Sequence, residues 1–371
     1  MKQGKSLIEL GNELQRQRNA RKDFIADTRT LEMASTDCGS IMRLFIDNNP
    51  HEFTVSDIAH QQIASRLQIP FRYYQKMQNE YPHLLDENIN SWFAKNGERR
   101  MVRVLDNQVR AFLSDRYRRL DNLELCAAVL PIINEMNGVD IMSCDVTDKH
   151  LYIKVVNKKI KAEISVGDVV QAGFVISNSE VGLGSLKVEP LIYRLVCKNG
   201  LIMKDFSQKR YHVGKQVSGD NDAAYEIYSD ATLEQDDKAF FMKVQDTVRC
   251  AVDETKFQMG VDRMRQAMNI PIHSNPVEAV EELADRFQIT QNERGDILRQ
   301  LFMGNDNSRY GLINAVTAAS KLANTYERAT DLERIGGELL ASSMPAHLRK
   351  NSRSEPYIEN ITPIRKELAH A

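Results

Sequence analysis

The chain has 371 residues, of which 42% are hydrophobic and 27% are charged, proportions that fit a globular protein of two or three domains. Its 49 lysines and arginines against 51 acidic residues give a net charge of −2, which excludes a uniformly basic, histone-like protein. Five scattered cysteines without a CxxC motif indicate reduced thiols, and no apolar stretch resembles a signal peptide or a membrane helix. We therefore expect a cytoplasmic protein with no membrane partner.

Residues 1–95 predict an N-terminal helical region. Within it, residues 54–77 have the pattern of two helices separated by a break. Thr54 or Ser56 can cap the first helix, and Gln68-Ile69-Pro70 forms the break. The second helix offers polar side chains that could enter the major groove of DNA, although such helix pairs are also common as packing units. These side chains are Arg72, Tyr73, Gln75 and Lys76.

Residues 96–215 change to a two-residue hydrophobic period, which predicts a central basic α+β domain. Val102 to Leu113 should form a hairpin about an Asp106-Asn107 turn, and a helix should follow from Asp121, its expected N-cap. Further strands are expected over 141–146, 151–156, 160–164, 169–177 and 187–203, the last with an Asn199-Gly200 turn. The short connections favour antiparallel pairing. The predicted fold class is α+β, with a central, mostly antiparallel sheet and a packed helix between N-terminal and C-terminal helical regions.

The remainder of the chain divides by composition. Residues 216–235 are predicted to be an acidic linker. Residues 236–342 predict a C-terminal helical region, in which Asn275 and Thr290 can cap helices. Residues 343–371 hold three of the ten prolines, so we expect an extended tail there.

The central domain is basic although the whole chain is not. Residues 95–215 carry a net charge of +6, whereas residues 216–257 carry −6. Arginines on an exposed strand face can hold phosphates, and aromatic rings can stack on unpaired bases. The same residues also fit a solvated sheet face with an ordinary complement of arginine. The candidate nucleic-acid-binding residues are Arg103, Arg110, Phe112, Arg116, Tyr117, Arg118 and Arg119.

Two further patterns have simple structural explanations. Cys197 and His212 could form a nucleophile–base pair, although a cysteine at the end of an apolar strand is more often only buried. Acidic residues in the expected linker could hold Mg²⁺ or Ca²⁺, but a flexible acidic linker explains them more simply. Those residues are Asp220, Asp222, Glu226 and Asp230. Because the GxxxxGK[ST], GxGxxG and HExxH motifs are absent, we expect no cofactor and no metal, and we assign no catalytic residue.

Several segments together resemble one protein family. They are Arg110 to Asn122, Arg194 to Leu201, Arg210-Tyr211-His212, and Tyr310 to Thr317 followed by Ala329 to Gly337, with Ile69 to Tyr73 and Asn88 to Trp92 also fitting. Over roughly residues 50–340 the chain is similar to the DUF932 family of phage- and plasmid-borne proteins. No catalytic residue is carried over from this resemblance. It implies a setting among the DNA replication, recombination or host-takeover genes of mobile elements.

Our leading hypothesis is a non-enzymatic nucleic-acid-binding protein of a phage or plasmid that acts in DNA replication or recombination. Single-stranded DNA is favoured because the basic residues lie on predicted strands, and the terminal helices could make homo-oligomer contacts. The alternative is a mobile-element protein that binds a host or defence protein. A third hypothesis is a metal-dependent nuclease that uses acids such as Asp145, Asp148 or Asp220.

Overall fold

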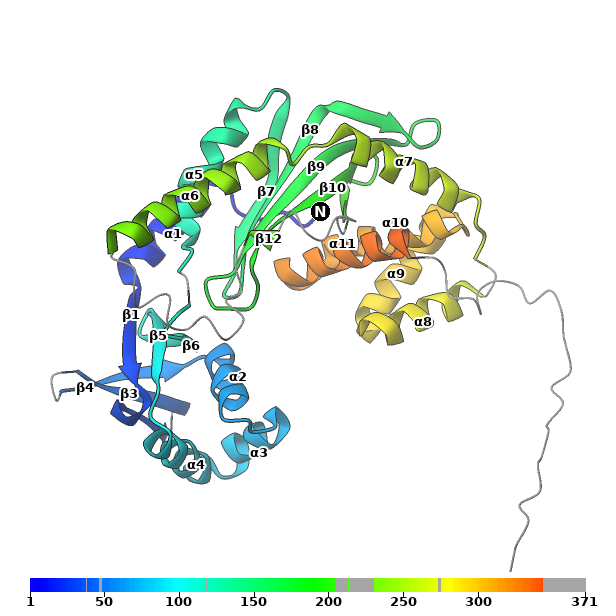
Figure 1. Ribbon diagram of the computed structural model, residues 1–371. Helices are drawn as coiled ribbons and strands as arrows, with labels where there is room; N and C mark the ends of the chain where they lie inside the picture. Colours follow the sequence, from blue (N-terminus) through cyan, green and yellow to red (C-terminus); the bar gives the residue numbers. More distant parts are fainter. Residues whose placement is uncertain are drawn as a thin grey trace, which may run out of the picture.

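The computed structural model describes residues 1–37, 39–46, 49–117, 119–203, 212–213, 230–272 and 275–342. These residues form an α+β fold of two lobes, each built around one sheet (Figure 1). The small lobe comprises the described residues of 22–114, and the large lobe comprises residues 1–20 together with the described residues from 119 onward. None of the helices in the described ranges is long and apolar enough to cross a membrane.

The small lobe follows directly on the first helix of the chain. That helix is α1 (Leu7–Ala20), and it packs in the large lobe. The elements of the small lobe are β1 (Lys22–Asp27), the short 3-10 helix η1 (Thr28–Thr30), β2 (Leu31–Thr36), β3 (Gly39–Ile46), β4 (Asn49–Val55), α2 (Asp57–Arg66), α3 (Phe71–Glu80), α4 (Pro82–Lys95), β5 (Arg99–Leu105) and β6 (Gln108–Ser114).

The small-lobe sheet has the strand order β1-β5-β6-β4-β3-β2, and its neighbours are antiparallel except for the parallel pair β4 and β6. Helices α2, α3 and α4 cover one face, where Ile63, Tyr74 and Ile89 belong to the buried apolar core. The predicted β5–β6 hairpin is confirmed. Its turn residues Asp106 and Asn107 have φ angles of +48° and +61°, as a tight turn between twisted strands requires.

The outer edge of β2 is closed by side chains of α4. The amide of Asn90 both accepts from the Met33 backbone N–H and donates to the Met33 carbonyl, each at 2.8 Å. The Asp86 carboxylate accepts from the backbone N–H of Ser35 at 2.7 Å. These bonds satisfy strand groups that would otherwise be an open edge, and they fix α4 against the sheet.

The large lobe is formed by α1 and by the chain after residue 119. Its further elements are α5 (Asn122–Glu135), β7 (Val139–Val146), β8 (Leu151–Glu163), β9 (Val169–Asn178), β10 (Leu186–Arg194), β11 (Asn199–Ile202), β12 (His212–Val213), α6 (Asp230–Arg249), α7 (Glu254–Met268), α8 (Pro276–Phe287), α9 (Gln291–Gly304), α10 (Arg309–Ala319), the 3-10 helix η2 (Ser320–Leu322) and α11 (Tyr326–Ala341).

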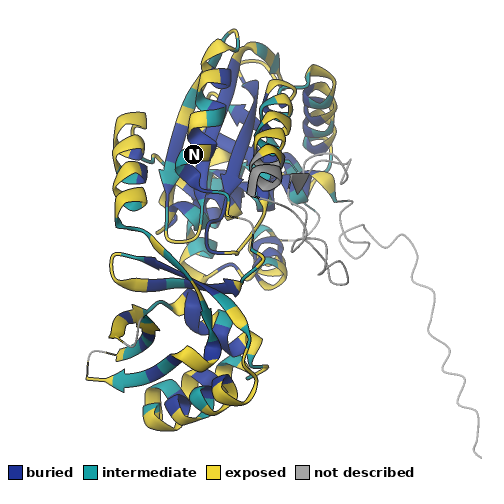
Figure 2. Cartoon of the chain, turned by 60° about the vertical axis from the view of Figure 1, so that its left-hand side comes forward, coloured by how far each residue is buried: buried dark blue, intermediate teal, exposed yellow. Residues whose placement is uncertain are grey.

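The large-lobe sheet is antiparallel, with the order β11-β10-β9-β8-β7 and with β12 paired to β10. Strands β8 to β11 are buried along most of their length, and their buried residues are drawn dark blue in Figure 2. Alternate residues face opposite sides, so that Ile153 and Phe174 pack with α1, α5 and α6, whereas Tyr152 and Val175 pack with Tyr326 of α11. The central sheet with a packed helix was therefore predicted in outline.

The expectation of helices throughout residues 1–95 is wrong for residues 22–55, which form four strands. In β2 and β3, alternate residues are buried, namely Leu31 and Met33, then Met42 and Leu44. Each strand therefore shows the two-residue period at only two fully buried apolar residues. An alternation this short does not distinguish a strand from a helix in the sequence. The expected central domain is also split, because β5 and β6 belong to the small-lobe sheet.

Two smaller expectations are also corrected. Asn199 and Gly200 lie in β11 rather than in a turn; the turn spans residues 195–198, where Lys198 takes a left-handed φ of +47°. Residues 230–235 begin α6 instead of ending a linker. The expected linker residues 216–229 and the expected tail 343–371 lie outside the described residues.

Candidate nucleic-acid interface at the junction of the lobes

Arg103 was predicted to contact phosphates, but it is completely buried at the junction of the two lobes. Its guanidinium donates to Asp23 at 3.0 Å, to Asp121 at 2.8 Å and to the Glu180 carbonyl at 2.9 Å. Burial alone would lower the pKa of Arg103, but the hydrogen bonds and charges of Asp23 and Asp121 raise it above its ordinary value. Arg103 therefore holds the lobes together and is unavailable to a ligand.

Phe112 was predicted to stack on bases, and that prediction is also wrong. Its ring is buried in the small-lobe core, with its centroid 5.7 Å from that of Phe93 in a stacked arrangement. The opposite face of β5 and β6 was expected to be exposed to solvent, but the large lobe covers it. There Met101, Ala111 and Leu113 form a small buried cluster with Val181.

Arg110 is nearly buried and pairs with Glu180, with 2.7 Å between the guanidinium and the carboxylate. The other Glu180 oxygen accepts from the backbone N–H of Asn122 at 2.6 Å, at the first turn of α5. A carboxylate at a helix N-terminus is stabilised by the unpaired N–H groups there, so Glu180 caps α5 from a distant loop. The Nε atom of Arg110 is buried and has no hydrogen-bond partner among the described residues.

Asp121 is the N-cap of α5 by position, but its side chain makes no capping bond. The carboxylate binds Arg103 and Arg21 instead. Burial would raise the pKa of Asp121, yet these two arginines hold it below its ordinary value. The residues of the Arg110–Asn122 motif are thus used largely for joining the lobes.

The remaining predicted residues lie around this junction. Tyr117 is half-buried and donates its hydroxyl to the Ser179 carbonyl at 3.0 Å, and burial raises its pKa. Arg119 is 56% exposed, 3.8 Å from Asp23. Arg116 is exposed, and Arg118 lies outside the described residues. The structure therefore keeps Arg116 and Arg119 at the surface and withdraws Arg103 and Phe112 from it.

The basic end of α1 was not among the predicted binding residues. Arg16, Arg18, Arg21 and Lys22 occur without an intervening acid, a signal that was available in the sequence but lay outside the segment whose charge was counted. In the structure this run lies beside the predicted region. Gln17, Arg18, Arg21, Arg110, Asp121, Glu124 and Glu180, among others, line a shallow cleft of about 20 Å³, which is too small to enclose a ligand.

Cations from two distant segments, Arg18 and Arg21 at the end of α1 and Arg110 in β6, therefore line one cleft, and Lys22, Arg116 and Arg119 are close to them in the chain. Arg18 and Lys22 are exposed, and neither makes an ion pair with any residue in the described part of the chain. We call the following set the junction band: Arg18, Arg21, Lys22, Arg110, Arg116 and Arg119. Asp23 and Asp121 hold Arg21, and Glu180 holds Arg110, whereas Arg18, Lys22 and Arg119 are exposed.

The helix–break–helix over residues 54–77 is confirmed as a structure. Ser56 caps α2 by accepting from Ala59 N–H at 3.2 Å, and Pro70 precedes α3. The four polar residues of α3 named from the sequence are all exposed. Their suitability for reading DNA stays a prediction.

The Cys197–His212 pair is excluded by the backbone. His212 pairs with Lys187 at the start of β10, whereas Cys197 follows Arg194 at its far end. Of the acids named for a nuclease, Asp145 forms an ion pair with Lys5 at 2.8 Å, and Asp220 lies outside the described residues. Within the described ranges, no group of three or more His, Cys, Asp or Glu side chains could hold a metal ion.

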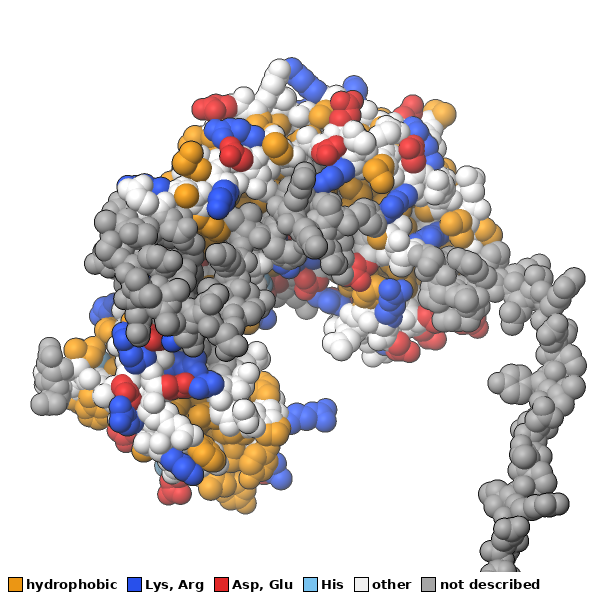
Figure 3. All heavy atoms as spheres, in the orientation of Figure 1, with side chains coloured by type: hydrophobic (Ala, Val, Ile, Leu, Met, Phe, Trp, Pro, Cys, Tyr) orange, Lys and Arg blue, Asp and Glu red, His pale blue; other side chains and the backbone are white. Residues whose placement is uncertain are grey.

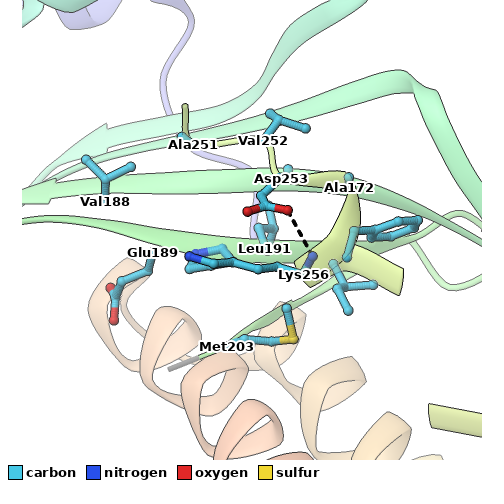
Figure 4. Close-up of a pocket in the computed structure, with 13 residues that line it drawn as sticks. Ala172, Val188, Glu189, Leu191, Met203, Ala251, Val252, Asp253 and Lys256 are labelled. Carbon is cyan, nitrogen blue, oxygen red and sulfur yellow. Dashed lines mark hydrogen bonds between the residues drawn. The ribbon is translucent and has the colours of Figure 1, made fainter. Parts of the chain in front are cut away.

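A second pocket lies between β10 and α7 (Figure 4). Its volume of about 20 Å³ is room for a water molecule rather than for a metabolite. Its acids already have structural roles, since Asp253 caps α7 by accepting from Lys256 N–H at 3.0 Å and Glu189 pairs with Arg334 at 2.7 Å. We assign no ligand to it.

The other sequence motifs form buried links between the large-lobe sheet and the C-terminal helices. Arg194 binds Asp168 at 2.6 and 2.8 Å, and the Tyr310 hydroxyl donates to the same carboxylate at 2.7 Å. The Asn199 amide donates to the Thr317 hydroxyl at 2.6 Å. These contacts explain the motifs as packing rather than as a second site.

A family model described as a domain of unknown function, DUF932, matches residues 111–341, more than half of the chain. The range begins within β6 and takes in almost the whole large lobe after α1, so the segments near residues 69–73 and 88–92 fall outside it. No curated protein and no solved structure matches the chain.

Proposed function

The chain belongs to the DUF932 family, and from that premise we propose that it is a cytoplasmic, non-enzymatic nucleic-acid-binding protein that prefers single-stranded DNA. The observation that supports the proposal is the junction band. The end of α1 and the segment from β6 to α5 bring cations to one cleft, although they are far apart in the sequence. Phosphates are the ligands that such a cluster of guanidinium and ammonium groups attracts.

The band combines fixed and solvated cations. Arg21 and Arg110 are held by Asp121 and Glu180. The cleft is therefore already ordered, and binding costs little conformational entropy at these two side chains. Arg18, Lys22 and Arg119 are exposed and would contact successive phosphates of a bound strand. The buried acids neutralise the inner arginines, so we assign the affinity to the exposed members.

The setting of this activity is proposed from the resemblance to phage- and plasmid-borne proteins. A protein that binds single strands without cleaving them suits DNA replication or recombination on a mobile element. Binding of a host or defence protein is the alternative.

The test is a fluorescence-anisotropy titration with labelled single-stranded and duplex oligonucleotides at low and moderate salt. The informative variant is Arg18→Ala/Lys22→Ala/Arg119→Ala. It should weaken binding and reduce the slope of log K against log salt by about 2 for a single strand, because each lost phosphate contact contributes roughly 0.7.

The matched control is Arg249→Ala/Arg286→Ala/Arg299→Ala, which removes three exposed cations from α6, α8 and α9. It should leave both affinity and salt slope unchanged. Absence of salt-sensitive binding by the wild-type protein contradicts the proposed function and favours the protein-binding alternative. Equal losses in both triple variants contradict the assignment to the junction band.

A further inference from the structure

A second surface, on the outer side of the small lobe, carries aromatic side chains that the fold leaves exposed. Tyr73, Tyr81 and Trp92 are 53%, 64% and 39% exposed. Among the described residues the other exposed aromatic rings are Phe45 and Phe302, so most of them gather here. Figure 3 shows hydrophobic side chains collected on the small lobe over α3 and α4. We call Arg72, Tyr73, Lys76, Tyr81, Leu84, Trp92 and Lys95 the α3–α4 face.

The exposed large apolar side chains of α4, Leu84 and Trp92, are not the ones that pack the helix on the sheet. Leu85, Ile89 and Phe93 form its buried stripe, and Asp86 and Asn90 fix it to the edge of β2. Leu84 and Trp92 are eight residues apart, about 80° around the helix axis, so both lie in one broad exposed stripe beside the buried one. Tyr81 precedes this stripe at the corner between α3 and α4. A gathered apolar surface of this kind on a fixed helix marks an interaction site.

Cations border the aromatic rings. The Lys95 ammonium lies 5.3 Å from the centroid of the Trp92 ring. Arg72 is exposed and, within the described residues, neither it nor Lys95 makes an ion pair, whereas Lys76 is 3.9 Å from Glu80. Aromatic faces next to phosphate-binding cations are the arrangement that holds single-stranded nucleic acids, because every unpaired base has a face to stack.

We infer that the α3–α4 face binds the unpaired bases of a single strand, with Tyr81 and Trp92 as stacking platforms and Arg72 and Lys95 on the adjoining phosphates. This inference rests on the proposed function and deepens it. The junction band attracts any phosphate backbone, whereas the α3–α4 face requires accessible bases. The preference for single strands over duplex then comes from the small lobe.

Trp92 is the only tryptophan in the chain, so its fluorescence reports on this face alone. The protein is titrated with oligothymidylate, with a duplex of equal length and with an abasic deoxyribose-phosphate strand of equal length, while anisotropy of a labelled copy reports total binding. Oligothymidylate should quench Trp92 over the same concentration range as the anisotropy change. The duplex and the abasic strand should bind without this quenching.

Tyr81→Ala should weaken oligothymidylate binding roughly tenfold and leave abasic-strand binding unchanged, as expected for one lost stacking contact. Tyr81→Phe keeps the ring and should restore affinity. Phe302→Ala removes an equally exposed ring from α9 and should have no effect.

The outcomes separate the two proposals. Salt-sensitive binding without quenching of Trp92, or with full affinity in Tyr81→Ala, overturns the base-stacking inference and leaves the junction band intact. Equal quenching by the abasic strand also overturns it. If Tyr81→Ala instead converts a dimer to a monomer in sedimentation with DNA affinity unchanged, the face binds a second copy and not bases. Failure of every strand to bind refutes the proposed function itself.

Discussion

The Arg103 guanidinium donates to the Asp121 carboxylate across 2.8 Å, and this ion pair joins the small lobe to the first turn of α5. Arg103 is fully buried and also binds Asp23, so one side chain connects β5, β1 and the large lobe. Arg103 would be able to contact a ligand only if the two lobes separated. Its role is to fix the cleft that the junction band surrounds.

Arg103→Met should destabilise the protein by about 3 kcal/mol, because it leaves Asp23 and Asp121 partly uncompensated in a buried place. Urea unfolding measures the change. The control is Arg29→Ala, which breaks an exposed pair with Asp27 in the same lobe and should leave the stability almost unchanged. Equal costs for the two variants would show that burial of Arg103 adds nothing.

Lys154 and Glu333 form a fully buried ion pair of 2.6 Å between β8 and α11. Glu333→Leu should cost about 3–5 kcal/mol, since it leaves the Lys154 ammonium buried and unpaired. Lys154→Met should cost less, because the Met1 ammonium remains 4.0 Å from the Glu333 carboxylate. The double variant should be more stable than either single variant. Additive losses in a denaturant double-mutant cycle would contradict the coupling.

His60 gives a pH dependence whose sign can be stated. Burial lowers its pKa from 6.5 to about 4 in the folded protein, where its Nδ1 is 2.7 Å from the Tyr74 hydroxyl. The unfolded chain therefore binds a proton first as pH falls, and stability present above pH 6.5 is lost towards pH 4, by up to about 3 kcal/mol. His60→Gln should flatten this part of the stability–pH curve. Parallel curves for the two proteins would refute the assignment.

Two helical glycines should respond oppositely to alanine. A Cβ at Gly337 would lie 1.9 Å from the Ile202 carbonyl oxygen, so α11 must move away from β11, and we expect a loss of more than about 2 kcal/mol. A Cβ at Gly295 in α9 meets nothing within 4 Å, and Gly295→Ala should gain about 0.5–1 kcal/mol. Thermal unfolding of both variants tests the pair; a stabilised Gly337→Ala would contradict the close approach of α11 to the sheet.

Turn residues, helix caps and alternating strands were predicted correctly, because each depends on residues close together in the sequence. The Asp106-Asn107 turn, the Ser56 and Thr290 caps and the antiparallel strands of the large lobe all have short-range patterns and were predicted correctly. The small-lobe sheet was missed for two reasons. Its pairings of β1 with β5 and of β4 with β6 span three helices and leave little local trace, and the alternation within β2 and β3 is short.

The exposure of the candidate site residues also depends on contacts between segments that are far apart in the sequence. The basic segment around Arg110 was predicted from its charge, but its strand face was expected to be exposed to solvent. Which arginine is buried depends on the large lobe, whose Glu180 loop packs on that face from seventy positions later in the chain. The contribution of Arg18 could not be linked to Arg110 before the fold was known, because only the tertiary structure brings α1 beside β6.

The chain enters the small lobe at Arg21 and leaves it before Asp121, and these two residues form an ion pair. The small lobe is therefore an insertion whose two ends meet. The large lobe could lose it, or exchange it for another domain, by joining α1 to α5 through a short linker without disturbing the sheet behind them. The family model begins at residue 111, within β6, shortly before the chain leaves the small lobe.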